Sequence, residues 1–290
     1  MKRNLGFALV LSTMGLGLAG VFLRRWQLAA AFEPDTGLLI PGQPATLALI
    51  AAVALAAALA VGLSVALFRG EAPKGYLANL AAPNLAVGLL TLLAGALLFA
   101  GGVLGIRDYI LRMNDRIVRL VLGVCLVPTG IAVGLIGLLG QQRKEAKGRF
   151  HGALLAPGYC ACVWLISAFQ NHAANPNVME YVFLLLGIVC VVFVGYAVAS
   201  FSFEKPRPIL CGISSALGVV LLAVSAGDQL WGMDLLMLLG FEGYLIAQLI
   251  CLTACRANPP ELEEWGPPVE EAEVAETTED QVQPRGEEDE

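Results

Sequence analysis

Long uninterrupted apolar runs constrain this chain more than any other feature of its sequence. A helix needs about 20 mainly apolar residues to cross the hydrocarbon core of a bilayer. Eight runs meet or approach that length, at Leu5–Leu23, Ala45–Phe68, Leu85–Ile106, Ile117–Gly140, Ala153–Phe169, Tyr181–Phe203, Ile209–Ala226 and Leu235–Cys255. The sequence lacks the shorter segments of alternating polar and apolar residues that are typical of membrane β-barrels. It therefore predicts an all-α polytopic membrane helix bundle of about eight spans, formed by residues 1–256.

Small residues at four-residue spacing predict where these helices pack closely. Gly101 is followed by Gly105, and Gly130 by Gly134. In membranes such pairs allow two helix backbones to approach each other. We expect contacts within the bundle, with a homodimer face as the alternative.

The C-terminal segment differs from the rest of the chain in charge and composition. Residues 257–290 hold 13 of the 24 acidic residues and one basic residue, Arg285. The remainder carries a net positive charge. A segment rich in Glu, Pro and Gln with a single aromatic residue cannot bury a core. We therefore predict a disordered acidic tail on a basic membrane domain.

Lys and Arg residues predict the orientation of the chain. With eight spans and the N-terminus inside, 12 of the 18 basic residues fall in cytoplasmic segments, including those of the loop "QQRKEAKGRFHG". The loop "QNHAANPNVME" has neither Lys nor Arg and suits the outer side. The positive-inside rule thus predicts that both termini are cytoplasmic.

The stretch "FLRRWQLAAAFEPDTGLLIPGQP", residues 22–44, follows the first apolar run. Arg24, Arg25 and Trp26 are typical of an interfacial anchor at the outer surface. Glu33 and Asp35 are close enough in sequence to offset the arginine charges, so the segment is predicted to be an anchor or a lid. A cleaved signal peptide is the alternative, but the first run is longer than the usual apolar region of about 7–15 residues.

Glu242 is the one acidic residue near the middle of a predicted span. An ionisable group at that depth normally faces the bundle interior or a partner. Arg119 lies in the outer half of the fourth span and is the available partner. We expect an ion pair at a proton or substrate site, a contact that fixes helix register, or a protonated Glu242 bonded to a backbone carbonyl.

Motifs of the common enzyme classes are missing from the sequence. It contains no P-loop, no GxSxG element and no dinucleotide fingerprint. Its two His and seven Cys residues do not occur at zinc-ligand spacing. Asp228 and Asp234, six residues apart, are interpreted as solvated loop acids rather than a cation site. The sequence thus predicts neither a cofactor nor a metal, and no basic patch predicts nucleic-acid binding.

Three stretches carry a resemblance to a known family. The segments "RRWQLAAAFEPDTGLLIPG", "HAANPNVMEYVFLLLG" and "FEKPRP" resemble those of a family of multi-pass membrane proteins in clostridial-type bacteria. The resemblance implies a location in the bacterial plasma membrane. It transfers no activity and no functional residue.

The function expected from the sequence is that of a non-enzymatic sensor or accessory membrane subunit. Its expected partners are the lipid bilayer and either another membrane protein or a second copy. A small-solute or ion transporter with a site at Glu242 and Arg119 is one alternative. A lipid-modifying enzyme beneath the outer loops is the other, and it would need a convergent acid–base pair.

Overall fold

The computed structural model describes residues 2–33, 38–70, 72–112, 117–142, 151–173, 177–203, 205–228 and 230–260. Eight of its helices are long and apolar enough to cross a membrane. They are α1 (Lys2–Ala30), α2 (Pro44–Phe68), α4 (Leu85–Arg112), α5 (Ile117–Leu139), α6 (His151–His172), α7 (Val182–Ser202), α8 (Pro208–Ala226) and α9 (Met233–Ala257). The short helix α3 (Leu77–Leu80) and the 3-10 turn η1 (Val178–Glu180) complete the elements of the described ranges.

These helices confirm the predicted all-α polytopic bundle. Within the described ranges, the β-structure is one isolated bridge between Phe32 and Leu39. The predicted acidic tail lies outside the described residues from position 261 onward.

Two helices continue well beyond their apolar runs. Helix α1 ends at Ala30 rather than Leu23, and α4 ends at Arg112 rather than Ile106. The 29 residues of α1 make it about 43 Å long, which exceeds the hydrocarbon core of about 30 Å. Backbone hydrogen bonding does not stop where charges begin, so Arg24 and Trp26 belong to a helix rather than to a loop.

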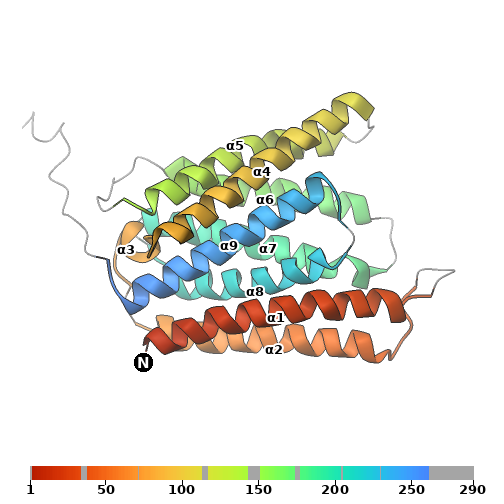
Figure 1. Ribbon diagram of the computed structural model, residues 1–290, viewed down its shortest axis with the longest axis horizontal. Coiled ribbons are helices and arrows are strands. Elements are labelled where there is room, and N and C mark those ends of the chain that lie inside the picture. The colour runs from red at the N-terminus through yellow and green to blue at the C-terminus, as the bar shows by residue number, and fades with distance from the viewer. Residues whose placement is uncertain are drawn as a thin grey trace, which may run out of the picture.

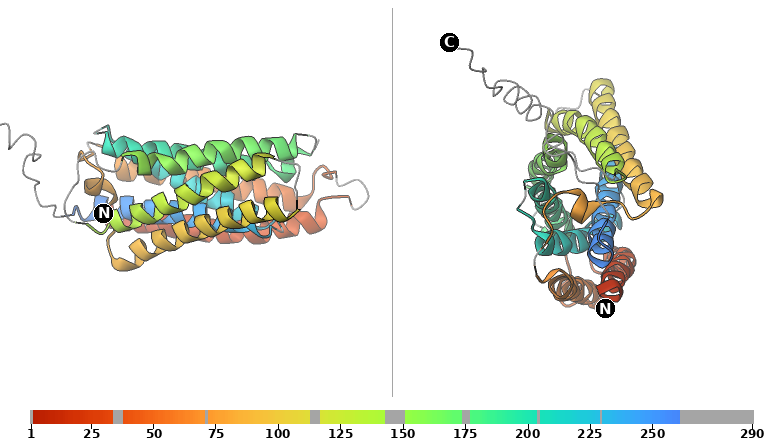
Figure 2. Two further views of the ribbon diagram at one scale, coloured as in Figure 1. Left: turned by 90° about the horizontal axis from the view of Figure 1, so that it is seen from above. Right: turned by 90° about the vertical axis from the view of Figure 1, so that its left-hand side faces the viewer.

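The axes of the long helices are roughly aligned, and long helices that follow one another in the chain run in opposite directions (Figure 1). Helices α1 and α2 pack together, as do α4 and α5, and α6 and α7. Helix α9 lies between the α4–α5 pair and the α1–α2 pair (Figures 1 and 2). Helix α8 has the largest buried share of the eight spans and α2 the smallest, so α8 is central and α2 peripheral.

The two ends of the bundle differ in what they hold. The start of α1 and the end of α9 lie at one end, on the left of Figure 1, which we call the terminal end. The ends of α1, α6 and α8 and the starts of α2, α7 and α9 lie at the other end, which we call the distal end. The polar side chains described below gather at the distal end.

Glycines allow the closest helix contact in the bundle, between α4 and α5. A Cβ atom on Gly130 would lie 2.5 Å from the backbone nitrogen of Phe99, and one on Gly95 would lie 2.6 Å from the carbonyl oxygen of Gly130. Any larger residue would force the two backbones apart. On the other side of α4, Gly101 faces Leu236 of α9. The small residues singled out in the sequence therefore pack helices within one chain, as expected.

Candidate functional site

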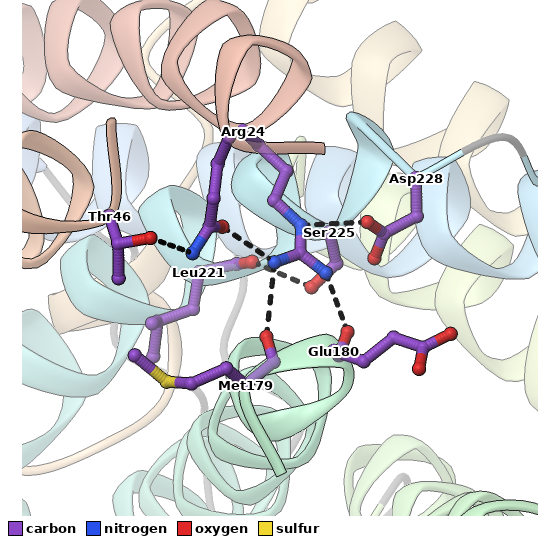
Figure 3. A network of polar contacts seen from close by, with 8 residues as sticks. Arg24, Thr46, Met179, Glu180, Leu221, Ser225 and Asp228 are labelled. Carbon is purple, nitrogen blue, oxygen red and sulfur yellow. Dashed lines mark hydrogen bonds and ion pairs between the residues drawn. The ribbon is translucent and has the colours of Figure 1, made fainter. Parts of the chain in front are cut away.

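Arg24 is buried at the distal end, and its guanidinium group is surrounded by acceptors (Figure 3). Its side chain is only 1% exposed and forms an ion pair with Asp228, with 2.7 Å between Nε and Oδ1. The Nη1 atom donates to the carbonyl oxygen of Met179 at 3.0 Å, and Nη2 donates to that of Glu180 at 2.6 Å. Arg24 thus joins α1 to the turn before α7 and to the turn after α8.

A side-chain amide extends this network to α2. Arg24 donates from Nη1 to Oε1 of Gln27 at 2.8 Å, and Gln27 donates from Nε2 to the hydroxyl of Thr46 at 3.1 Å. The guanidinium also lies 5.7 Å from the ring centre of Phe183, a cation–π contact. Arg24 and Gln27 together therefore connect α1 to α2, to the turn before α7 and to the turn after α8.

The turn after α8 makes room for Arg24 at Gly227 and supplies its acidic partner, Asp228. Gly227 leaves room for the arginine, since a Cβ atom there would lie 2.9 Å from Cβ and Cγ of Arg24. Burial raises the pKa of the Asp228 carboxyl, and the Arg24 guanidinium acts in the opposite direction. Asp228 is therefore a partly buried, paired acid, and the interpretation of it as a solvated loop residue is wrong.

The residues of the predicted outer-surface anchor differ in their exposure. Arg24 is wrong as an anchor, because the helix turns its side chain into the bundle. Arg25 and Trp26 are exposed, as an interfacial anchor requires. Glu33 is exposed, and its backbone N–H donates to the carbonyl oxygen of Leu38. Asp35 lies outside the described residues.

A second arginine–aspartate pair lies at the same end of the bundle. Arg119 of α5 donates from Nη2 to Oδ2 of Asp234, in the first turn of α9, at 3.0 Å. The predicted pairing of Arg119 with Glu242 is therefore wrong. Asp234 lies about two helical turns closer than Glu242 to the start of α9, at the depth where Arg119 enters the bundle. An acidic residue in the first turn is also stabilised by the helix dipole.

This second pair stands on the rim of a cavity of about 360 Å³. The cavity lies between α5, α6, α7 and α9. Polar side chains of Arg119, Ser167, Asn171, His172 and Asp234 share its lining with the apolar residues Leu122, Trp164, Ala168, Leu184, Leu230, Met237 and Leu238. Its volume is within the usual range of small-molecule sites, about 300–1,000 Å³.

Aromatic contacts fix two sides of the cavity. The ring of Trp164 on α6 stacks on Phe241 of α9, with 5.2 Å between ring centres. The ring of His172, at the end of α6, stacks on Tyr181 at 4.8 Å. The first contact connects α6 and α9 directly, and the second holds the end of α6 against the start of α7. The cavity is thus part of the folded bundle rather than a gap between loops.

Glu242 lies apart from this cavity. It is half-buried on the face of α9 that carries Leu239, which is 39% exposed, and Ile246. No hydrogen bond or ion pair joins Glu242 to another residue in the described part of the chain. It is therefore an unpaired acid at mid-span on a face of α9 that this chain leaves partly uncovered.

Residues of the described ranges do not form a group of three or more His, Cys, Asp or Glu suited to a metal ion. Comparisons with protein-family models, curated proteins and solved structures find no match for this chain. What the protein does is therefore inferred from its own geometry.

Proposed function

We propose that this multi-pass membrane protein is a non-enzymatic sensor that binds a small amphipathic ligand in the distal cavity. The observation that supports it is the lining, an apolar surface that also contains a charged pair, a hydroxyl, an amide and an imidazole. Binding sites for small molecules have this composition, with apolar walls and a few polar groups that fix orientation.

We infer from the positive-inside rule that the distal end lies outside the bacterial plasma membrane and that both termini are cytoplasmic. Trp231 is 81% exposed at the distal end, and Gln142 is exposed near the terminal end. In a chain whose exposed Cys162 is replaced by Ser, an impermeant maleimide added to intact cells should label Trp231→Cys but not Gln142→Cys. Labelling of Gln142→Cys alone would reverse the orientation.

Fluorescence of Trp164 reports on the cavity directly. In a variant that keeps Trp164 and carries Phe at Trp26, Trp231 and Trp265, acrylamide should quench the remaining tryptophan through the cavity. A bound ligand should protect it. Suitable probes are L-phenylalanine, 3-phenylpropanoate, 2-phenylethylamine and a phosphatidylethanolamine lipid.

A cavity-filling variant supplies the control. Ala168→Phe should abolish protection, because Ala168 lines the cavity, whereas Cys162→Phe on the exposed face of the same helix should leave it intact. If none of the probes protects Trp164, the sensor proposal fails.

The position of Glu242 supports a second candidate, that of an accessory subunit. An unpaired acid at mid-span is costly, by about 2.5–3.5 kcal/mol on insertion scales, unless it meets a partner. A helix of another membrane protein, or of a second copy, would cover this face. Where the partner is a second copy, oxidation of the Leu239→Cys variant in native membranes should join two chains by a disulfide, and Glu242→Leu should reduce its yield. Absence of that disulfide dimer would remove the second copy as the partner.

The transporter alternative receives less support from the geometry. Arg119 lines the cavity, but Glu242 is not among its lining residues, so the two do not define one path. We propose that the protein is not an enzyme because its sequence lacks the motifs of the common enzyme classes, and conversion of a bound probe or lipid would contradict this.

A further inference from the structure

The charged pair on the cavity rim has unused hydrogen-bonding capacity. An arginine carries five N–H donors and a carboxylate two acceptor oxygens. The contact between Arg119 and Asp234 uses Nη2 and Oδ2, and the side chains remain 41% and 40% exposed. The arginine therefore still has free donors and the aspartate a free oxygen, side by side on one rim.

The charges of this pair determine which ligand the rim can attract. A simple anion would be attracted by Arg119 but repelled by Asp234, which is only 3.0 Å from the arginine. A simple cation would be attracted by Asp234 but repelled by Arg119. A group that carries both charges can place its negative end on the arginine and its positive end on the aspartate. Electrostatic complementarity of this kind selects between ligands more than it adds affinity.

The apolar lining adds a second requirement. Leu122, Trp164, Met237 and Leu238 lie in the cavity wall beside the charged pair. Burying the apolar part of a ligand there is favourable by about 25 cal/mol per Å² of surface removed from water. A zwitterion without an apolar group would gain none of this.

We propose that the distal cavity binds a zwitterionic amphiphile. The ammonium group lies against Asp234, the carboxylate or phosphate against Arg119, and the attached apolar group against Trp164 and Leu238. This assignment rests on the proposed ligand-binding function and adds the chemical class of the ligand. Two sources share this chemistry: a free α-amino acid with a large apolar side chain, and the phosphoethanolamine headgroup of a membrane lipid.

The test compares probes that share a phenyl group and differ in charge. L-phenylalanine carries both charges, 3-phenylpropanoate only the negative one and 2-phenylethylamine only the positive one. Binding is measured by protection of Trp164 from acrylamide, in nanodiscs of phosphatidylglycerol, which has no ammonium group. The same measurement in nanodiscs that contain phosphatidylethanolamine forms the lipid arm.

We expect L-phenylalanine to bind at least about tenfold more tightly than either singly charged probe, because each of those leaves one rim charge unmatched. Arg119→Gln and Asp234→Asn should each weaken binding by a similar factor. Arg25→Gln, on an exposed arginine at the same end, should not. The comparison of probes leaves both rim residues unchanged, so it stands even if a rim variant fails to fold.

The outcomes separate this inference from the proposed function. If only phosphatidylethanolamine protects Trp164, the ligand is a lipid headgroup, and if only L-phenylalanine protects it, the ligand is a free amino acid. Equal protection by all three phenyl compounds would overturn the zwitterion assignment while leaving a ligand-binding cavity. Protection by none of the probes, lipid included, would overturn both.

Discussion

Two arginine–aspartate pairs lie at the distal end of this bundle, and they differ in burial and in the number of hydrogen bonds that the arginine makes. Arg24 and Asp228 are 1% and 28% exposed, and the arginine has further acceptors on Gln27 and on two backbone carbonyls. Arg119 and Asp234 are 41% and 40% exposed and share a single contact on the rim of a cavity.

The difference shows how burial decides what an ion pair does. Arg24 is buried and four of its five N–H donors already have partners, so it offers little to a ligand, and removing its partners leaves an uncompensated charge. An exposed pair contributes little to stability and keeps free donors and acceptors. We therefore assign the Arg24 pair to holding helices together and the Arg119 pair to binding.

The largest expected effect comes from removing the buried arginine. Arg24→Met should lower the free energy of unfolding by about 3–5 kcal/mol, because Asp228 and two backbone carbonyls lose their partner. Unfolding in mixed detergent micelles, followed by loss of helical circular dichroism, measures this change.

The neighbouring arginine provides the matched control. Arg25→Met changes the same residue type one position along α1, where the side chain is exposed, and should stay within about 0.5 kcal/mol of the natural protein. Equal losses for the two variants would mean that the network has no special structural role.

A smaller effect is expected when the acid of the buried pair is neutralised. Asp228→Asn should cost about 1–3 kcal/mol, because its amide oxygen can still accept a hydrogen bond from Nε of Arg24 while the charge interaction is lost. The variant is compared with Asp234→Asn in the same unfolding measurement. A larger loss for Asp234→Asn would invert the roles assigned to the two pairs.

The exposed pair should contribute still less to stability. Arg119→Gln should change the free energy of unfolding by about 0–1 kcal/mol, as is usual for exposed ion pairs. The same variant should lose binding of a zwitterionic probe, so stability and binding are expected to separate. A loss of stability as large as that of Arg24→Met would show that the rim is structural.

Glu242 gives the smallest expected effect, because it has neither kind of pairing. Glu242→Gln should alter the stability of the purified chain by less than about 0.5 kcal/mol, since no described contact is removed. Thermal unfolding in detergent checks this value. A loss above about 1 kcal/mol would indicate a partner for Glu242 within the chain.

The sequence predicted the bundle well because membrane helices must satisfy their backbone groups internally, and apolar runs reveal them. It predicted helix ends poorly. In α1 the apolar run ends at Leu23, but the backbone hydrogen bonds of the helix continue to Ala30. Residue type alone predicted exposed positions for Arg24, Arg25 and Trp26, and only Arg25 and Trp26 are exposed, because the helix turns Arg24 into the bundle.

The candidate site was harder to predict because its contacts join residues far apart in the chain. The distance along the sequence from Arg24 to Asp228 is 204 residues, and that from Arg119 to Asp234 is 115 residues. One signal was present: Asp228 and Asp234 flank the start of α9 at the depth of two arginines on other helices. Helices α5 and α9 both start at the distal end, so matching depth from their starts favours Asp234 over Glu242 as the partner of Arg119.

Double-mutant cycles on the two pairs, measured side by side by unfolding of the full chain, test the central claim most directly. Each cycle combines Arg→Met with Asp→Asn and gives the coupling energy between the two side chains. We predict about 2–3 kcal/mol for Arg24 with Asp228 and less than about 1 kcal/mol for Arg119 with Asp234. Equal coupling energies, or a larger value for the exposed pair, would contradict the division of the distal end into a structural network and a binding rim.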